Sequence, residues 1–397
     1  MSVLVINSGS SSLKYQLVEV AQGTALASGL VERIGEPDSV ITHQHGTESV
    51  RTELDIRDHS AALAAVLDQF TRIGPSLHSV GIEAVGHRTV HGGEVFSTPT
   101  LIDHEVMAQV DALSDLAPLH NPANVTGMRV ARELLPDVPH VAVFDTAFFT
   151  SLPAAAGTYA IDTAVAEKYG IRRYGFHGTR HEYVSREAAR FLGRPVADLN
   201  QIVLHLGNGA SASAIRAGMA VDTSMGLTPL EGLVMGTRPG DLDAGVLIHL
   251  MRNGLTPDDL SDLLNKRSGL KGLSGVNDFR ELQDLVDAGD SDARLAFDVY
   301  IHRLRKVLGA YTGVLGRVDV LTFTAGVGEN SAAVRAATVA GLEVLGFSVE
   351  ADRNVVRSRR ARVISPDGAR VTVLVVPTNE ELAIARHAMG LIVSTGK

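Results

Sequence analysis

Charged and imidazole side chains stand at the ends of several apolar runs in the sequence, next to glycine or proline. Arg88 lies in AVGHRTVHGG, and Asp145 directly follows the run VAVF. The other members of this set have similar settings: Lys14, His120, His177, Arg238 and Glu380. Phosphoryl transfer requires cations for the equatorial oxygens, acids that hold Mg²⁺, and two oxygens positioned in line. Two arginines, two histidines, two acids and a lysine match these needs.

Each of these side chains also fits a structural role when it is considered alone. A lone arginine more often forms a surface ion pair, and a lone histidine is more often a hydrogen-bonded structural residue. Glu380, in the first turn of a helix, is favourable to the helix dipole without any function. Asp145 is the least easily explained in this way, because the sequence around it offers its carboxylate no partner.

The stretch NSGSSSLK, residues 7–14, separates the apolar run VLVI from the alternating run LKYQL. This pattern predicts a strand, a tight polar turn and a second strand. A turn whose N–H groups, hydroxyls and lysine face one spot would suit a phosphate. By itself, however, the stretch favours an ordinary Gly/Ser turn over a phosphate site.

A second stretch, IVLHLGNGASASAI at residues 202–215, repeats the same arrangement about 200 residues later. Each copy has an apolar strand, a turn containing Asn, Gly and Ser, and an alternating second strand. Such internal similarity indicates a duplicated domain. If the two halves face each other, both turns would converge on one cleft, which strengthens the phosphate interpretation.

Composition places limits on the class of protein. The length of 397 residues favours two domains, and the net charge of −9 argues against a nucleic-acid partner. The absence of cysteine excludes disulfides, thiolate metal sites and a cysteine nucleophile. The N-terminal apolar run is too short for a signal peptide and no run reaches membrane-spanning length, so the cytoplasm is the expected compartment and no membrane partner is expected.

Strand-like and helix-like runs alternate along the chain, which predicts an α/β fold. Strands are predicted at 3–6, 84–90, 140–145, 201–207, 320–326 and 371–377. Helices are predicted at 59–70, 121–135, 256–266, 292–315, 331–345 and 379–389, with Asn121 as the N-cap of the second and Pro122 as its first residue.

The common phosphate-binding motifs are absent. The sequence has no Walker-type P-loop, and AGVGENS (325–331) lacks the third glycine of a dinucleotide fingerprint. We expect AGVGEN to form a Gly-x-Gly turn through which a flat ligand approaches the backbone. His177 and His181 have a spacing that could bind a metal on a helix, but no third ligand lies nearby in the sequence, so zinc is not favoured.

Nine stretches of the sequence together resemble the acetate kinase (acetokinase) family. They occur in family order from residue 3 to residue 386: NSGSSSLKYQL, GHRTVHGGE, LAPLHNP, VFDTAF, YGFHGT, HLGNGAS, DTSMGLTPLEGLVMGTRPGDLD, FTAGVGEN and PTNEELAIA. The resemblance implies the duplicated two-domain α/β fold of the actin, Hsp70 and sugar-kinase ATPases, with a central interdomain cleft. The first domain would comprise residues 1–149 and 380–397, and the nucleotide-binding domain residues 150–379.

The resemblance also implies a function, which is ATP:acetate phosphotransfer by a direct in-line mechanism in a homodimer that needs Mg²⁺ or Mn²⁺. Asn7 and Glu380 would hold the metal, and Asp145 would be the essential acid. The implied catalytic residues are Arg88, His120, Asp145, His177 and Arg238. The implied substrate pocket comprises Arg88, Val90, Leu119, Phe176 and Pro229. The implied ATP-binding residues are Ser10, Ser12, Lys14, His205, Leu206, Gly207, Asn208, Gly209, Asp278, Phe279, Arg280, Gly326, Val327, Gly328, Glu329 and Asn330.

Two stretches depart from the family pattern. A histidine-containing stretch is usual after VFDTAF, where this sequence has Phe149 to Pro153, and a small residue is usual at the position of Arg180. Other activities also remain open at this stage. A propionate or butyrate kinase is the nearest alternative, and a nucleotide-gated chaperone or filament protein with the same fold is a remote one.

Overall fold

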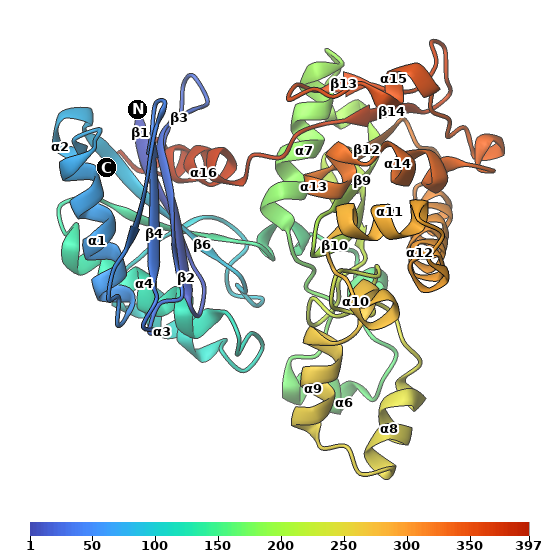
Figure 1. Cartoon of the computed structure of the whole chain (residues 1–397), viewed down its shortest axis with the longest axis horizontal. Coiled ribbons are helices and arrows are strands. Elements are labelled where there is room, and N and C mark those ends of the chain that lie inside the picture. The colour runs from blue at the N-terminus through green and yellow to red at the C-terminus, as the bar shows by residue number, and fades with distance from the viewer. Residues whose placement is uncertain (397) are drawn as a thin grey trace. The chain divides into compact units, whose positions relative to one another are not determined.

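The computed structural model describes residues 1–396, which divide into two compact units. The first unit is Met1–Thr150 together with Asn379–Lys397, and the second is Ser151–Thr378. Sequence reasoning placed the junctions one residue away, at 149/150 and 379/380. The α/β fold class expected from the sequence is confirmed (Figure 1).

An eight-stranded sheet with the order β5-β4-β3-β2-β1-β6-β8-β7 forms the centre of the first unit. Its strands are β1 (Ser2–Ser8), β2 (Ser12–Glu19), β3 (Thr24–Glu32), β4 (Val40–His45), β5 (Glu48–Glu53), β6 (Ile82–Thr89), β7 (Thr100–Leu101) and β8 (His140–Phe144). The strands from β1 to β5 pair as antiparallel neighbours, whereas β6 runs parallel to both β1 and β8. Because β1, β6 and β8 are parallel neighbours, their carboxyl-terminal ends lie side by side.

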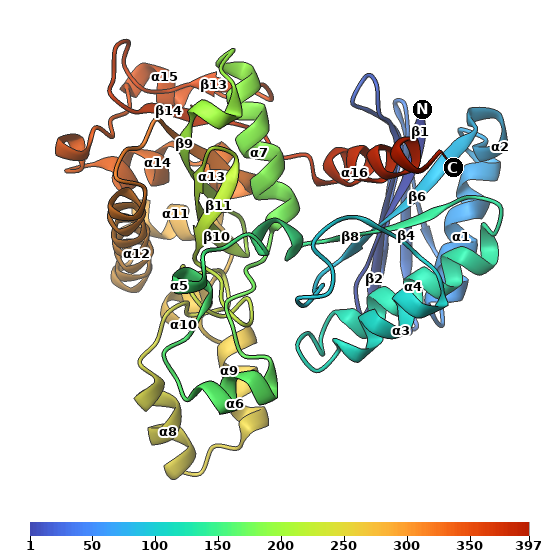
Figure 2. The ribbon, with the colours of Figure 1, turned by 180° about the vertical axis from the view of Figure 1, so that it is seen from behind.

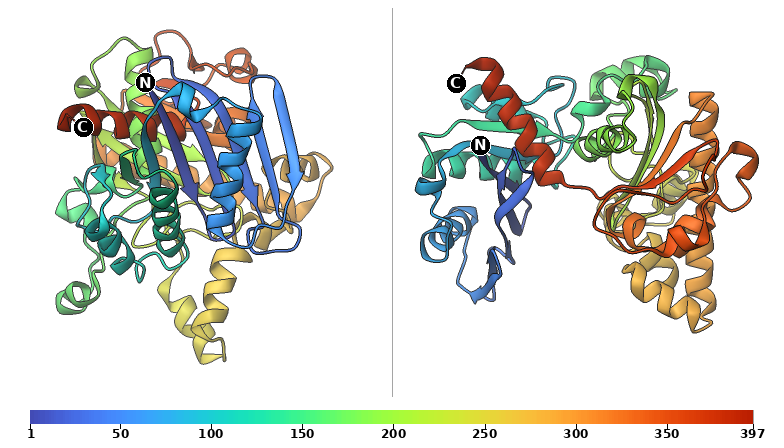
Figure 3. Two further views of the ribbon diagram at one scale, coloured as in Figure 1. Left: turned by 90° about the vertical axis from the view of Figure 1, so that its left-hand side faces the viewer. Right: turned by 90° about the horizontal axis from the view of Figure 1, so that it is seen from above.

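Helices cover both faces of this sheet, which explains why the centre of β1, residues 3–6, is a continuous apolar run. The helices are α1 (His59–Arg72), α2 (Leu77–Val80), α3 (His104–Ala112), α4 (Asn121–Leu134) and α16 (Glu380–Thr395). Leu4 and Ile6 belong to the core cluster that contains Phe70 of α1. Val3 lies on the opposite face, where Ile384 of α16 packs directly against Gly86 of β6. Figure 3 shows α16, in red, on the other side of this sheet from α1.

The second unit repeats the pattern around a six-stranded sheet with the order β11-β10-β9-β12-β14-β13. Its strands are β9 (Asn200–Leu206), β10 (Ala210–Arg216), β11 (Met219–Thr223), β12 (Val320–Thr324), β13 (Arg362–Val363) and β14 (Thr372–Val375). An antiparallel trio, β9 to β11, is again followed by two parallel strands, β12 and β14. The duplication inferred from the two hairpins therefore extends to the order of the strands.

The second unit contains more helices than the first (Figure 2). They are α5 (Ala154–Gly157), α6 (Thr163–Tyr169), α7 (Gly178–Phe191), α8 (Ala244–Arg252), α9 (Pro257–Lys266), α10 (Gly269–Ser274), α11 (Phe279–Asp287), α12 (Ser291–Leu315), α13 (Ala325–Asn330), α14 (Ala332–Val339) and α15 (Ala351–Val355). No helix within residues 1–396 has both the length and the apolar composition needed to cross a membrane.

The expected strands and helices are present, with three local corrections. The helix predicted at 331–345 is too long, because α14 ends at Val339. The Gly-x-Gly turn predicted at AGVGEN is wrong, because residues 325–330 form the short helix α13 directly after β12. The predicted N-cap of α4 is also wrong. His120 occupies the cap position, and Asn121 is buried inside the first turn, where its side chain bonds to the backbone of His91 and Val110.

Candidate active site

The guanidinium of Arg88 joins three segments of the first unit at the sheet edge where β1, β6 and β8 end. Arg88 Nη2 lies 2.6 Å from Asp145 Oδ2, and Arg88 Nε lies 2.9 Å from Glu380 Oε1. Arg88 Nη1 donates to Asn7 Oδ1 at 3.4 Å. Asp145 follows β8 directly and Glu380 begins α16, so the fold brings together four residues that sequence reasoning had singled out separately.

This cluster is largely shielded from solvent, with exposed side-chain fractions of 18% for Arg88, 1% for Asp145 and 7% for Glu380. Burial alone would lower the pKa of the Arg88 guanidinium, but the negative charges of Asp145 and Glu380 outweigh burial and raise that pKa above its ordinary value. Arg88 is therefore a permanent cation. The partner that the sequence around Asp145 did not reveal is this arginine, 57 residues away in the chain.

The oxygens around Arg88 suit a magnesium ion. Mg²⁺ is usually held by one or two carboxylates, waters and substrate phosphates rather than by a cage made entirely of protein. Asn7, Asp145 and Glu380 supply an amide oxygen and two carboxylates, and the buried Asp145 Oδ1 has no hydrogen-bond partner within residues 1–396. The same part of the chain contains no group of three or more His, Cys, Asp and Glu side chains that could hold a metal by itself. The donor set thus fits a partly hydrated Mg²⁺ ion.

The hairpin between β1 and β2 carries the predicted phosphate-binding residues of the first unit. Its turn is closed by a hydrogen bond of 2.8 Å from Gly9 N to Ser12 O. Lys14 is half exposed and its ammonium pairs with the carboxylate of Glu381. Sequence reasoning missed Glu381, although its position directly after Glu380 in the first turn of a helix was a usable signal.

A cavity of about 790 Å³ lies in the second unit at the ends of β9 and β12. Its walls include eight residues predicted to bind ATP: Gly207, Asn208, Asp278, Phe279, Arg280, Gly326, Val327 and Asn330. They also include residues that sequence reasoning missed: Gly236, Leu270, Asn277, Gln283, Asp284, Tyr300, Ser331 and Arg357. The helical periodicity of the amphipathic helix α11 could have indicated Gln283 and Asp284, which lie one turn after Arg280.

Five other residues predicted to bind ATP do not line this cavity. His205, Leu206 and Gly209 belong to the β9–β10 hairpin, and Gly328 packs against the backbone of Phe323. The carboxylate of Glu329 accepts hydrogen bonds from the backbone N–H groups of Ala325 (2.9 Å) and Thr378 (3.1 Å). Burial raises the pKa of Glu329.

His177 and Arg238 approach the same glycine of the second hairpin. His177 precedes α7 with a φ of 60°, and its Nδ1 lies 2.8 Å from Ser211 Oγ. A Cβ atom at Gly209 would lie 2.7 Å from Arg238 Nη2 and 3.5 Å from His177 Cε1. Any side chain at Gly209 would therefore displace the guanidinium. Burial lowers the pKa of Arg238, and its Nη1 donates to Pro229 O at 2.7 Å.

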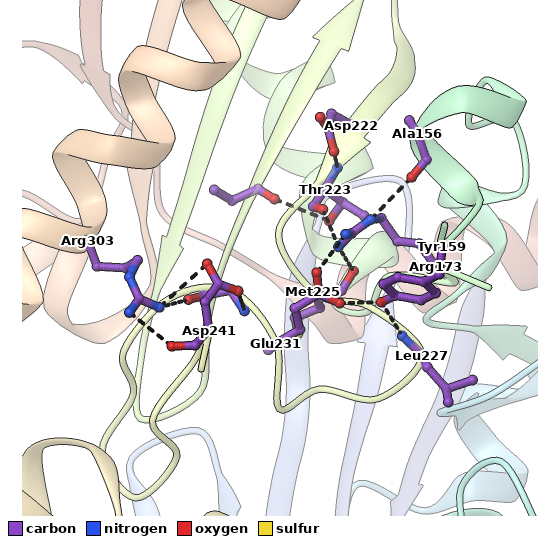
Figure 4. Close-up of polar contacts among 12 residues, drawn as sticks. Ala156, Tyr159, Arg173, Asp222, Thr223, Met225, Leu227, Glu231, Asp241 and Arg303 are labelled. Carbon is purple, nitrogen blue, oxygen red and sulfur yellow. Dashed lines mark hydrogen bonds and ion pairs between the residues drawn. The ribbon is translucent and has the colours of Figure 1, made fainter. Parts of the chain in front are cut away.

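Two largely shielded arginines hold the loop that includes Glu231 and Asp241, as Figure 4 shows. Arg238 lies between these two residues in the sequence. Arg173 donates to the carbonyls of Ala156, Thr223 and Met225 and forms an ion pair of 2.6 Å with Glu231. The hydroxyl of Tyr159 donates to the same carboxylate and accepts from Leu227 N. Arg303 donates to Gly232 O at 2.6 Å and to Asp241 O at 3.1 Å. The loop is therefore fixed on both sides of Arg238, an arrangement that its Gly- and Pro-rich sequence did not predict.

The remaining predicted substrate residues occupy different environments. Val90 is 5% exposed, directly follows β6, and donates its N–H to Asn124 Oδ1 at 3.1 Å. Phe176 is buried, whereas Leu119 is 61% exposed. His120 stands at the N-terminus of α4 and makes no side-chain capping hydrogen bond there.

Comparison with known proteins adds a consistent assignment. A family model described as the acetokinase family matches residues 2–386. A curated acetate kinase of Streptomyces coelicolor is 60% identical over 397 residues, which cover 99% of this chain and 98% of that protein. The crystal structure of Porphyromonas gingivalis acetate kinase superposes with a TM-score of 0.95 at 44% identity, covering 98% of this chain and 99% of that chain. A propionate kinase from Francisella tularensis has a TM-score of 0.92 at 38% identity with the same coverage.

Proposed function

The chain belongs to the acetokinase family, and on that basis we propose that it catalyses the reversible transfer of the γ-phosphoryl group of ATP to acetate. An acetate oxygen forms the new bond to phosphorus while the bond from phosphorus to the β,γ-bridging oxygen breaks, giving acetyl phosphate and ADP. The structural observation that carries the proposal is the buried cluster of Arg88, Asp145 and Glu380.

In this mechanism Arg88 and Arg238 bind the carboxylate of acetate and stabilise the charge on the equatorial oxygens of the transferring phosphoryl group. Both guanidiniums are mostly buried and held by fixed partners, so they are oriented before the substrate arrives. Preorganised cations stabilise a transition state more effectively than mobile ones, because they need not reorient during the reaction. His177 would donate a hydrogen bond to the same group, and His120 would contribute to the same proposed site.

Asn7, Glu380 and Asp145 would hold Mg²⁺, directly or through water, and Mn²⁺ offers similar coordination chemistry. The bound ion would neutralise charge on the nucleotide phosphates. Lys14 would add a cation near the phosphates, while Ser10 and Ser12 would contribute hydroxyls from the first hairpin. The cavity lined by Asn208, Asp278 and Gly326 would accept the adenosine part of ATP.

Acetate is the preferred acceptor in this proposal. The relative with 60% identity is named an acetate kinase, and the propionate kinase is less similar at 38%. Val90, Leu119, Phe176 and Pro229 would form the small apolar pocket for the methyl group. Butyrate, which is longer by two carbons, would fit this pocket least well.

We also propose that the protein is a homodimer and that α8 contributes to the interface with the second copy. None of the nine residues of α8 is buried, and the apolar side chains of Val246, Ile248 and Met251 are each more than 40% exposed. In Figure 1, α8 and α9 project away from the sheet of the second unit. Exposed apolar residues concentrated in this way are typical of subunit interfaces. Val246→Glu should convert a dimer to a monomer in analytical ultracentrifugation, and a monomeric parent protein would refute the assignment.

The test of the function is the trapping of acyl phosphates with hydroxylamine. The purified protein is incubated with ATP, MgCl₂ and acetate, propionate or butyrate in separate reactions, with a reaction lacking ATP as the control. We expect the hydroxamate to form fastest with acetate and ADP to appear in equal amount. ATP hydrolysis without hydroxamate in every reaction would overturn the proposed phosphotransfer.

A further inference from the structure

Four side chains of the second unit form a continuous hydrogen-bonded chain that ends on His177. Ser213 Oγ lies 2.7 Å from His181 Nδ1, and His181 Nε2 lies 2.8 Å from Ser211 Oγ. Ser211 Oγ in turn lies 2.8 Å from His177 Nδ1. Ser211, Ser213 and His181 have no exposed surface. The chain therefore runs through the interior, and only its last member belongs to the proposed catalytic set.

The spacing of these residues explains the geometry. His177 is the residue before α7 and His181 lies four residues later in the first turn of that helix, and both imidazoles contact Ser211 Oγ. Ser211 and Ser213 are two residues apart on β10, so their side chains point to the same face of the sheet. Two histidines at helical spacing thus meet two serines at strand spacing. This arrangement accounts for the HGTRH pattern without a metal.

The number of protons available fixes the direction of the hydrogen bonds. Burial, with a smaller contribution from the charge of Arg180, lowers the pKa of His181 to about 3, so its ring is neutral and carries one N–H. Within residues 1–396, Ser213 Oγ has only His181 Nδ1 as a hydrogen-bond partner. If His181 Nδ1 carried the proton, the buried Ser213 hydroxyl would have no acceptor, which is costly. Ser213 therefore donates to His181 Nδ1.

The rest of the chain follows from this first step. His181 must carry its proton on Nε2 and donate it to Ser211 Oγ. Within residues 1–396, the Ser211 hydroxyl has the two imidazoles as its hydrogen-bond partners. It accepts from His181 Nε2, so its own proton goes to His177 Nδ1. His177 Nδ1 is then an acceptor. A neutral His177 must carry its proton on Nε2, the nitrogen on the other side of the ring.

We propose that Ser213, His181 and Ser211 are positioning residues that hold His177 as the neutral tautomer with its proton on Nε2. The inference rests on the proposed function only in the role that it gives to Nε2–H, which would donate to an oxygen of the transferring phosphoryl group. A hydrogen-bond donor of fixed direction serves phosphoryl transfer by stabilising charge, and no proton needs to leave it.

The surroundings of His177 favour the same neutral state. Protonation at Nδ1 would require every hydrogen bond in the chain to reverse, which would leave the Ser213 hydroxyl without an acceptor. The guanidinium of Arg238 and the ring of His177 both approach the position that a Cβ atom of residue 209 would occupy, and the ring of His205 lies 4.7 Å from that of His177 between centroids. A further cation near these hydrogen-bonded residues is Arg180 of α7, whose charge helps to lower the pKa of His181.

Nitrogen NMR of the substrate-free protein labelled with ¹⁵N-histidine tests the assignment. The His177 signals are identified by their loss in His177→Asn. We expect Nδ1 to appear as an unprotonated nitrogen and Nε2 as a protonated one from about pH 8 down to about pH 6, across the ordinary histidine pKa. A proton on His177 Nδ1 in the parent protein would overturn the proposal without any variant.

Variants separate positioning from simple packing. Ser213→Ala touches no atom of His177, yet it removes the donor that starts the chain, so a population with the proton on His177 Nδ1 should appear. Ser211→Ala should have the same effect, and Ser211→Thr, which keeps the hydroxyl, should restore the Nε2–H form. Ser365→Ala removes another buried serine hydroxyl of the same unit and should leave the His177 signals unchanged. An unchanged His177 tautomer in a folded Ser213→Ala protein would refute the chain.

Kinetics provides the second readout. Ser213→Ala should lower kcat roughly tenfold, the rate equivalent of one ordinary hydrogen bond, with an unchanged KM for ATP. Because the spectra are recorded without substrates, the two proposals can fail separately. A protein that shows the Nε2–H tautomer but forms no acetyl phosphate would refute the proposed function alone. An active acetate kinase with the proton on His177 Nδ1 would refute the positioning chain alone.

Discussion

Arg88 and Asp145 form an ion pair of 2.6 Å across two adjacent parallel strands, with the aspartate almost completely buried. The same guanidinium contacts Glu380 at 2.9 Å. A single arginine therefore balances two buried carboxylates that are far apart in the sequence. Because a buried charge without its partner is strongly destabilising, this arginine has a structural duty as well as the proposed catalytic one.

Replacement of Arg88 should affect rate and stability in different proportions depending on the substitute. Arg88→Lys keeps the charge but cannot serve Asp145, Glu380 and Asn7 in three directions, so kcat should fall roughly 10²-fold or more while the protein remains folded. Arg88→Ala should in addition lower the melting temperature. Steady-state kinetics, ADP binding by calorimetry and thermal melts distinguish the two effects. Near-normal turnover of Arg88→Lys would contradict the proposed role.

Replacement of Arg238 should lower turnover to a similar extent without weakening ADP binding. Arg238→Ala removes a preorganised cation, a change typically worth about 3 kcal/mol in the transition state, or roughly 10²-fold in rate. Exposed Arg252 on α8 provides a control, and its alanine variant should retain the parent kcat. Equal rates for the two variants would remove Arg238 from the proposed catalytic set.

Glu380→Gln should raise the requirement for Mg²⁺. The substitution preserves the size of the side chain and removes one carboxylate from the proposed metal-binding set, so the Mg²⁺ concentration for half-maximal rate should increase roughly 10- to 100-fold. Glu381→Gln changes the adjacent carboxylate, which pairs with Lys14, and is the matched control. A magnesium titration that is identical for Glu380→Gln and the parent protein would leave Glu380 as an ion-pair partner of Arg88 only.

Val90→Ala should change the choice of carboxylate. The smaller side chain would leave space for the extra carbon of propionate, and one methylene in an apolar pocket is worth about 1–3 kcal/mol. The ratio of kcat/KM for propionate to that for acetate should therefore rise by roughly 10- to 200-fold. Val90 is also buried at the end of β6, so its truncation could act on the core alone. In that case the melting temperature would fall and the substrate ratio would stay constant.

The stability of the protein should decrease in mild acid. Burial lowers the pKa of His181 to about 3 and of His91 to about 4, from an ordinary value of 6.5. The unfolded chain takes up these protons below about pH 6.5 and the folded protein does not, so stability is complete above that pH and decreases as the pH falls towards 4. The expected slope is roughly 1 kcal/mol per pH unit for each histidine. In denaturant titrations His91→Asn should reduce this slope, whereas exposed His302→Gln should not.

The sequence predicted the two hairpins because apolar strands that flank a polar turn produce a distinct local pattern. It did not predict that AGVGEN is helical, because Gly326 and Gly328 disfavour a helix and only the contacts after β12 stabilise one. The wrong capping role of Asn121 has a similar origin. Its side chain bonds to His91, 30 residues earlier, and such a distant partner leaves no mark in the sequence next to Asn121.

The candidate site shows the same division between local and distant information. The types of Arg88, Asp145 and Glu380 indicated phosphoryl transfer, but their mutual contacts depend on which strand ends lie together. Conversely, the spacing of His177 and His181 allowed a metal that the sequence did not favour, and it gave no sign of the actual partners, Ser211 and Ser213 on a strand about 30 residues away. Residue type was therefore informative, and partner identity required the fold.

The first unit is assembled from two segments that a ribosome makes at different times. Residues 151–378 are synthesised before α16, which covers one face of the first sheet and brings Glu380 to Arg88. At about 5–20 residues per second, tens of seconds pass between the synthesis of Gly86 and that of Ile384, which packs against it. During this time that face of the nascent sheet lacks its covering helix. Throughout this interval the growing chain displays an apolar surface that a chaperone can bind. The emergence of α16 thus sets the earliest moment at which the first unit can assemble.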